Sequence, residues 1–204
     1  MQPFDLLPSP VQKILINLEE KDRKERDAGL DRLKRLRQIP RETGEFLFQF
    51  LMTFSLQFPD FLGLEIGTSG GYSTLWQGMA LVRNGHGRLI SIDHDPKKYK
   101  MANENVLSTE ASQFVELIHG DAKDFLKKSQ NTFNYVFIDC EKEDYCYFFE
   151  SLVNRLTPGT VLIADNVISH ADYMEGFINQ IKCNSKVSSV ILTIGSGLAF
   201  TRWI

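Results

Sequence analysis

The stretch 64–73, Leu-Glu-Ile-Gly-Thr-Ser-Gly-Gly-Tyr-Ser, constrains the fold more than any other part of this chain. It follows an apolar run, 61–66, that is typical of a buried strand, and it leads into residues 74–81, which can continue as a helix. Its three glycines therefore fall in a tight turn between a strand and a helix. Glycine has no Cβ and can take positive φ, so a ligand can lie against bare backbone there and face the free N–H groups of the helix start.

Strand and helix patterns alternate along the rest of the chain. Further strands are predicted over 88–93, 114–119, 134–139 and 160–165, and helices over 45–51, 95–106, 121–128, 144–156 and 172–182. The strand cores are nearly continuous apolar runs, which indicates burial on both faces. This alternation predicts an α/β protein with a mostly parallel sheet and helices on both faces.

The end of the chain departs from this alternation. The last two predicted strands, 189–194 and 198–204, are separated by only three residues, Gly195-Ser196-Gly197. Three residues cannot form a parallel crossover, so these strands must form an antiparallel hairpin. The complete pattern is a seven-stranded, mostly parallel sheet with a C-terminal antiparallel hairpin.

The N-terminal part, 1–37, is predicted to be a helical arm of one domain that spans 1–204. Residues 11–37 have a helical pattern that is crowded with charge. Leu30, Leu33 and Leu36 recur at a spacing of three and could form a narrow apolar seam. The arm is interpreted as a solvated helix that lies on the domain. The alternative is that it covers a bound ligand or joins two copies in a homodimer.

Composition and net charge argue against some classes of binding partner. The net charge of −3 over 204 residues gives no overall excess of basic residues, which disfavours nucleic acid or an anionic membrane as the main partner. No apolar run approaches the length of about 18 residues that a membrane span needs, and we expect neither a span nor a signal peptide. The three cysteines include no Cys-x-x-Cys pair, which favours a reducing, cytoplasmic location without a disulfide framework or a zinc site.

Three predicted strands end in an acid, namely Asp93, Asp139 and Asp165. Ligands of open α/β sheets bind outside the carboxyl ends of the strands. Asp93 lies 26 residues after Gly67, where an acid can accept hydrogen bonds from ribose hydroxyls; the alternative is a cap for the next helix. Asp139, Asp165 and Asn166 offer hard oxygen ligands suited to Mg²⁺, although each could instead serve a cap or a turn.

Five segments, in matching order, resemble the cation-dependent O-methyltransferases, the group that includes catechol and caffeoyl-CoA O-methyltransferases and their small bacterial relatives. These segments are 64–73, Ile-Ser-Ile-Asp at 90–93, Phe-Ile-Asp-Cys-Glu-Lys-Glu-Asp-Tyr at 137–145, Ala-Asp-Asn-Val at 164–167 and Ile-Gly-Ser-Gly-Leu at 194–198. The similarity covers roughly residues 37–204. It implies the Rossmann-like fold of class I methyltransferases and the cofactor S-adenosylmethionine.

The resemblance also implies roles for individual residues. Asp139, Asp165 and Asn166 are the implied ligands of Mg²⁺ or another divalent cation. Lys142 and Asp139 are the implied catalytic residues, with Lys142 at the position of the general base of the catechol enzymes. The residues implied to hold the cofactor are Glu65, Gly67, Thr68, Ser69, Gly71, Tyr72, Ser73, Asp93, His94, Gly120, Asp121, Ala122 and Asp139.

The predicted function is therefore transfer of a methyl group from S-adenosylmethionine to a hydroxyl of a small molecule, an aromatic vicinal diol, with divalent-metal assistance. Ala199 stands where the catechol enzymes carry an acid, which disfavours catechol itself as the acceptor. Two alternatives are a metal-independent methyltransferase of the same fold and a non-catalytic, cofactor-binding or dimeric scaffold. A nicotinamide dehydrogenase is disfavoured because the glycine spacing differs from Gly-x-Gly-x-x-Gly.

Overall fold

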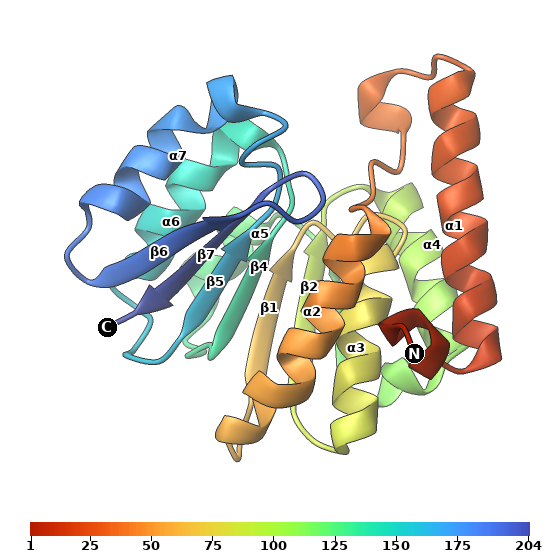
Figure 1. Ribbon diagram of the computed structural model, residues 1–204, viewed down its shortest axis with the longest axis horizontal. Coiled ribbons are helices and arrows are strands. Elements are labelled where there is room, and N and C mark those ends of the chain that lie inside the picture. The colour runs from red at the N-terminus through yellow and green to blue at the C-terminus, as the bar shows by residue number, and fades with distance from the viewer.

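The computed structural model describes residues 1–204 and is built around one seven-stranded sheet, as predicted (Figure 1). The strand order is β3-β2-β1-β4-β5-β7-β6, in which β7 runs antiparallel to both of its neighbours and the other pairs are parallel. The strands are β1 (Leu62–Ile66), β2 (Arg88–Asp93), β3 (Val115–His119), β4 (Tyr135–Ile138), β5 (Val161–Ala164), β6 (Val187–Leu192) and β7 (Leu198–Trp203).

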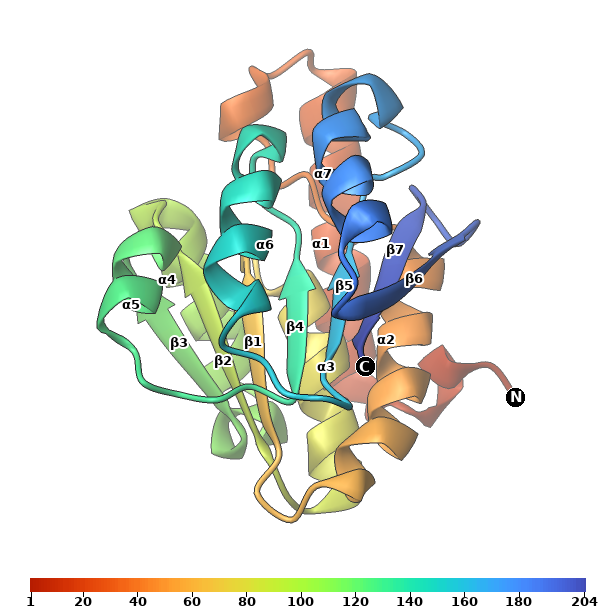
Figure 2. The ribbon, with the colours of Figure 1, turned by 90° about the vertical axis from the view of Figure 1, so that its left-hand side faces the viewer.

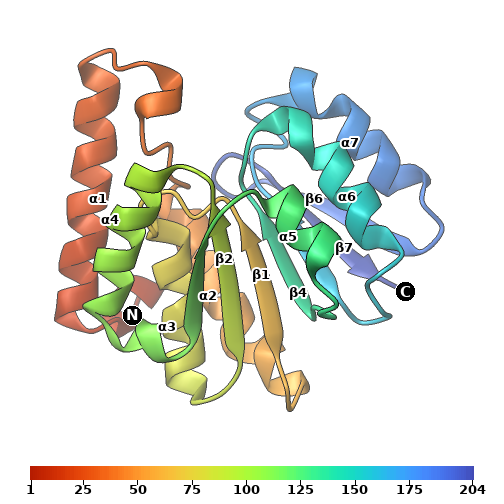
Figure 3. The ribbon, with the colours of Figure 1, turned by 180° about the vertical axis from the view of Figure 1, so that it is seen from behind.

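Helices cover both faces of this sheet. In Figure 3, α5 and α6 lie in front of the sheet and α2 and α3 lie behind it, and Figure 2 shows the same layers from the side. The helices are α1 (Ser9–Asp27), α2 (Arg41–Phe54), α3 (Tyr72–Asn84), α4 (Pro96–Leu107), α5 (Ala122–Lys128), α6 (Tyr145–Val153) and α7 (Ala171–Cys183). No helix is both long and apolar enough to cross a membrane.

Alternate side chains of each strand point to opposite faces of the sheet and pack into two separate hydrophobic cores, as the two-residue period of a strand requires. Leu64 and Ile66 of β1 pack into the core under α5, α6 and α7. Tyr135 and Phe137 of β4 point the other way, into the core under α1, α2 and α3. Burial on both faces explains why β4 and β5 have apolar sequences without a polar side.

The N-terminal arm differs from the prediction of helix over 11–37. The first long helix, α1, ends at Asp27, and Gly29 follows with a left-handed φ of 63°. The chain then turns back through a short 3-10 helix, Arg32–Lys34, and Leu36 is buried in the core. Leu30 and Leu33 are exposed. The predicted leucine seam is therefore absent, and it gives no support to a homodimer.

Glu65, in the middle of β1, is a fully buried acid that connects three elements. Its carboxylate accepts hydrogen bonds from Gln77 Nε2 of α3 at 2.6 Å, from Ser91 Oγ of β2 at 2.5 Å and from the Thr74 hydroxyl of α3. Burial raises the pKa of Glu65 to about 7, because the stabilising hydrogen bonds offset only part of the loss of hydration. Glu65 thus fixes the start of α3 against β1 and β2.

This raised pKa predicts a specific dependence of stability on pH. Between its ordinary pKa of 4.5 and its folded pKa of about 7, Glu65 binds a proton in the folded state only. Its contribution to stability is therefore complete below pH 4.5 and is lost as the pH rises toward 7. Relative to Glu65→Gln, which does not titrate, the wild type is expected to lose on the order of 3 kcal/mol of unfolding free energy across this range.

Urea unfolding of both proteins at about pH 5 and about pH 8 measures this difference directly. Glu110→Gln, which changes an exposed glutamate, is the matched control and is expected to follow the wild type at both pH values. Equal pH dependence in Glu65→Gln and in the wild type would contradict the proposed ionisation of Glu65.

Candidate active site

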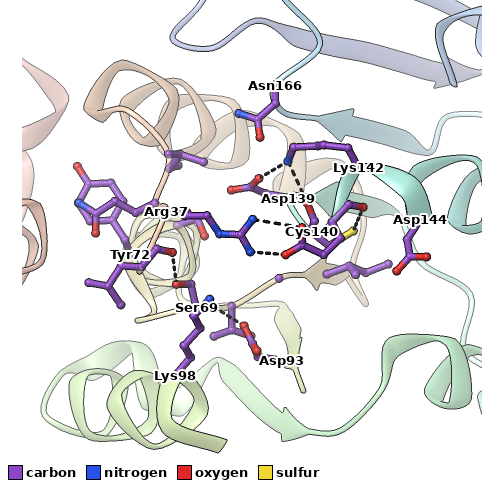
Figure 4. A pocket seen from close by; sticks show the side chains of 18 of the residues that line it. Arg37, Ser69, Tyr72, Asp93, Lys98, Asp139, Cys140, Lys142, Asp144 and Asn166 are labelled. Carbon is purple, nitrogen blue, oxygen red and sulfur yellow. Dashed lines mark hydrogen bonds and ion pairs between the residues drawn. The ribbon is translucent and has the colours of Figure 1, made fainter. Parts of the chain in front are cut away.

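A cavity of about 580 Å³ lies at the carboxyl ends of the parallel strands (Figure 4). Its walls come from the glycine turn after β1, the ends of β2, β3 and β4, the segment after β5, and the connection between α1 and α2. Its volume is typical of sites that hold small molecules or cofactors. The position agrees with the general rule for ligand sites in open α/β sheets.

Gly67 forms the floor of the cavity where β1 and β4 come together. Its φ is +106°, and a Cβ placed there would lie 2.0 Å from the carbonyl oxygen of Asp139. No other residue fits, because both the backbone conformation and the contact exclude a side chain. The glycine turn therefore places backbone without a side chain beside Asp139, the residue that follows β4.

Asp93 and Asp121 border the cavity at the ends of β2 and β3. The Asp93 carboxylate accepts hydrogen bonds from the backbone N–H of Ser69 at 2.7 Å and of Asp95 at 2.9 Å, and so supports the left-handed conformation of Ser69. Asp121 caps α5 by accepting from the backbone N–H of Lys123. Both acids act as caps or turn supports, and both still line the cavity.

Most residues that were predicted to hold a cofactor do line this cavity. They are Gly67, Thr68, Ser69, Tyr72, Ser73, Asp93, His94, Gly120, Asp121, Ala122 and Asp139. Glu65 and Gly71 are outside the lining. The Glu65 carboxylate is hydrogen-bonded to side chains of α3 and β2. Gly71, with a left-handed φ of +87°, packs on Ala102 of α4. In this structure these two residues shape the turn from behind.

Lys142 is a buried lysine, 6% exposed, beside the end of β4. Its ammonium donates to Asp139 Oδ1 at 3.3 Å, to the Cys140 carbonyl at 2.9 Å and to the Tyr145 hydroxyl at 3.1 Å. These three acceptors match its three protons. Burial raises the pKa of Asp139, and the charge of Lys142 opposes that rise. Figure 4 shows Lys142 and Asp139 together at one side of the cavity.

Asp165 and Asn166 lie close to this pair, directly after β5. Asp165 is 1% exposed; its Oδ2 accepts from Asn166 Nδ2 at 2.9 Å, while its Oδ1 is buried without a partner. Burial, together with the negative charge of Asp139, raises the pKa of Asp165 to about 8. Asn166 lines the cavity, whereas Asp165 lies just behind the wall.

These residues fit a hard divalent cation. The donors here are two carboxylates, Asp139 and Asp165, and one amide, Asn166, and no group of three histidine, cysteine or acidic residues is present. The partnerless Oδ1 of Asp165 and its electrostatic conflict with Asp139 are both features that a bound cation would relieve. Mg²⁺ prefers carboxylate and amide oxygens of this kind over a thiol or an imidazole.

The connection between α1 and α2 also borders the site, although none of its residues was predicted to have a role there. Figure 1 shows it above the ends of the strands, and residues 35–40 line the cavity. The Ser69 hydroxyl donates to the Leu36 carbonyl at 2.6 Å, and the Arg37 guanidinium is paired with Glu141. The connection thus forms part of the cavity wall, while α1 itself lies on the domain with Val11, Leu15 and Leu18 in the core.

His170, Ser169 and Ser196 also line the cavity without having been predicted to do so. Burial, together with the positive charges of Lys142 and Arg32, lowers the pKa of His170. Ser169, His170 and Ser196 reach the wall because the segment after β5 contacts the β6–β7 turn. There, Ile168 and Ser169 donate backbone hydrogen bonds to the Ser196 carbonyl. No local motif indicates that contact.

Known proteins with similar sequences match about half of this chain. A catechol O-methyltransferase from Niastella koreensis is 38% identical over 109 residues, which cover 52% of this chain and 48% of that protein. A catechol O-methyltransferase from Mycobacterium tuberculosis is 34% identical over 106 residues, with 52% and 47% covered. The chain thus spans about half the length of these curated relatives.

Solved structures match over nearly the whole chain. The O-methyltransferase from Bacillus cereus in complex with SAH has a TM-score of 0.77 at 24% identity and covers 98% of this chain and 93% of that chain. The SAH-bound methyltransferase PaMTH1 from Podospora anserina has a TM-score of 0.79 at 18% identity, with 97% and 89% covered. Both matches show the same Rossmann-like fold.

The family model described as "Methyltransferase domain" matches residues 64–167, from the glycine turn to the segment after β5. This range holds the end of β1, the whole of β2 to β5 and most of the cavity wall. The chain therefore belongs to this methyltransferase domain family.

Proposed function

We propose that this chain transfers a methyl group from S-adenosylmethionine to a hydroxyl of a small aromatic acceptor with neighbouring hydroxyl groups, assisted by a divalent cation. The observation that carries the proposal is one cavity whose wall combines the glycine turn with an oxygen-rich group, Asp139 and Asn166 backed by Asp165. The names of the catechol O-methyltransferase relatives support the acceptor class.

One end of the cavity suits the cofactor. The backbone around Gly67 can approach a ligand closely, and Asp93 keeps unused acceptor capacity for ribose hydroxyls. The part of the wall formed by Gly120, Asp121 and Ala122 is a place for the adenine ring. S-adenosylmethionine bound in this way would supply the methyl group. The chain contributes alignment, which an in-line displacement at the methyl carbon requires.

The acceptor would lie at the other end, beside Asp139, Lys142 and Asn166. A divalent cation held by Asp139, Asp165 and Asn166 would lower the pKa of the acceptor hydroxyl. Lys142 is placed to receive the hydroxyl proton or to stabilise the oxyanion left by its loss. To accept a proton, its amino group must first be neutral, so one of its three present hydrogen bonds has to be given up.

One contact favours a second candidate, a metal-independent methyltransferase. The Lys142 ammonium already lies 3.3 Å from Asp139 Oδ1 and places a positive charge beside this carboxylate without a metal. In that case Lys142 alone would stabilise the acceptor oxyanion. Dependence on a divalent cation separates the two candidates.

Calorimetric titration with S-adenosylhomocysteine tests the cofactor site. The wild type is expected to bind with a Kd on the order of micromolar. Asp93→Asn removes a charged acceptor and should weaken binding about tenfold or more. Asp124→Asn changes an exposed acid of α5 outside the cavity and serves as the matched control. Absence of binding to the wild type would refute the methyltransferase proposal.

Metal removal tests the oxygen-rich group. Mg²⁺ should raise the thermal midpoint of the wild type, because a cation that binds only the folded state stabilises it, and Asp165→Asn should abolish that rise. Methyl transfer should fall about a hundredfold in chelator and recover with excess Mg²⁺. Asp172→Asn, an exposed acid of α7, is the control. Equal turnover with and without chelator would support the metal-independent candidate instead.

A further inference from the structure

One ion pair joins two parts of the cavity wall that are far apart in the sequence. The Arg37 guanidinium, on the connection between α1 and α2, donates to both carboxylate oxygens of Glu141, with 3.3 Å between Nη1 and Oε2. Glu141 lies in the segment that follows β4. Arg32 of the same connection approaches Glu141 only to 3.8 Å and is 45% exposed. Arg37 is therefore the main tie between these two parts of the wall.

The Arg37–Glu141 pair lies beside the proposed cofactor site. Burial lowers the pKa of Arg37, but the hydrogen bonds and the charge of Glu141 raise it above its ordinary value. The charges of Asp139 and Asp93 add to this rise, so the guanidinium lies near the ends of both β4 and β2. Figure 4 shows Arg37 reaching into the cavity between Asp139 and Asp93. The side chains of the pair are 26% and 31% exposed, so the pair lies on the solvent side of the cavity.

The N-terminal arm fixes the direction in which Arg37 points. Arg37 has a left-handed φ of 51°, which is uncommon for a residue other than glycine and persists only where the surroundings impose it. Its backbone N–H donates to Asp22 Oδ1 at 3.0 Å, and Asp22 is a buried acid, 7% exposed. The neighbouring Leu36 donates its N–H to Glu25 Oε2, and its carbonyl accepts from the Ser69 hydroxyl. These contacts hold the strained backbone that directs the guanidinium across the cavity.

A role in stability alone does not account for this construction. Ion pairs between exposed partners contribute little to folding stability, and a left-handed backbone at a residue other than glycine reduces that stability. Resting on the function proposed above, we propose that the Arg37–Glu141 pair is a latch that holds the connection closed over the bound cofactor. A cofactor that reaches from Asp93 to Asp139 would lie under this latch, so S-adenosylhomocysteine could leave only after the pair had broken.

A latch of this kind sets the rates of cofactor exchange and leaves the affinity unchanged. The pair joins two parts of the protein and makes no contact of its own with the cofactor, so it stabilises the closed connection equally with and without cofactor. Its loss should therefore speed entry and exit by the same factor. The loss of a residue that binds the cofactor directly would instead raise the dissociation rate and weaken the Kd.

Surface plasmon resonance with S-adenosylhomocysteine and the immobilised full chain tests this proposal. Arg37→Gln and Glu141→Gln should each raise both the association and the dissociation rate constants about fivefold, the factor expected for a partly exposed ion pair, with an unchanged Kd. The double variant should match the single variants, because all three lack the same pair. Added salt should speed exchange in the wild type and not in the double variant. Arg23→Gln, an exposed arginine of α1 outside the cavity, is the control and should keep the wild-type rates.

Two outcomes would overturn the latch. Rate constants that Arg37→Gln and Glu141→Gln both leave unchanged would show that the pair does not limit exchange. A faster dissociation with a weaker Kd in Arg37→Gln, together with wild-type rates in Glu141→Gln, would show that Arg37 binds the cofactor itself.

The failure of this proposal can be told apart from the failure of the proposed function. Absence of S-adenosylhomocysteine binding to the wild type would refute the proposed function and, with it, a latch over that cofactor. Binding to the wild type at rates that the two single variants share would refute the latch alone.

Discussion

The close approach of Gly67 to the carbonyl of Asp139 is the constraint on which the site depends. A Cβ at residue 67 would lie 2.0 Å from that carbonyl oxygen, so the ends of β1 and β4 can meet only because residue 67 is glycine. This contact sets the cavity floor, and it places the glycine turn within one cavity with Asp139 and Lys142. The proposed cofactor and acceptor positions therefore belong to one cavity.

Polar groups buried behind the floor hold it in place. Glu65 connects β1 to α3 and β2, and Asp93 supports the left-handed Ser69 of the turn. Asp165, beside Asp139, retains a buried oxygen without a partner. The carboxylates of Glu65 and Asp93 have hydrogen-bond donors within the protein, as members of a structural network should. Asp165 has an oxygen without a donor, which is why we place the cation and the acceptor there.

Local patterns were sufficient to predict the sheet, its C-terminal hairpin and the acids at the strand ends. β2 occupies the predicted range because its apolar run ends sharply at Asp93. The arm could not be predicted in this way. Its path depends on the left-handed Gly29 and on Asp22 and Glu25, whose carboxylates accept the backbone N–H groups of Arg37 and Leu36. Likewise, the position of Glu65 behind the turn follows from contacts with α3 and β2 that the glycine motif does not specify.

A crystal structure of the S-adenosylhomocysteine complex would test the central claim most directly. The account predicts ligand density along the cavity, with the ribose hydroxyls at Asp93, the adenine beside Asp121 and Ala122, and the sulfur pointing toward Asp139 and Lys142. Density at another surface, or a ligand whose sulfur lies away from Asp139, would contradict the assignment of the glycine turn and the oxygen-rich group to one active site.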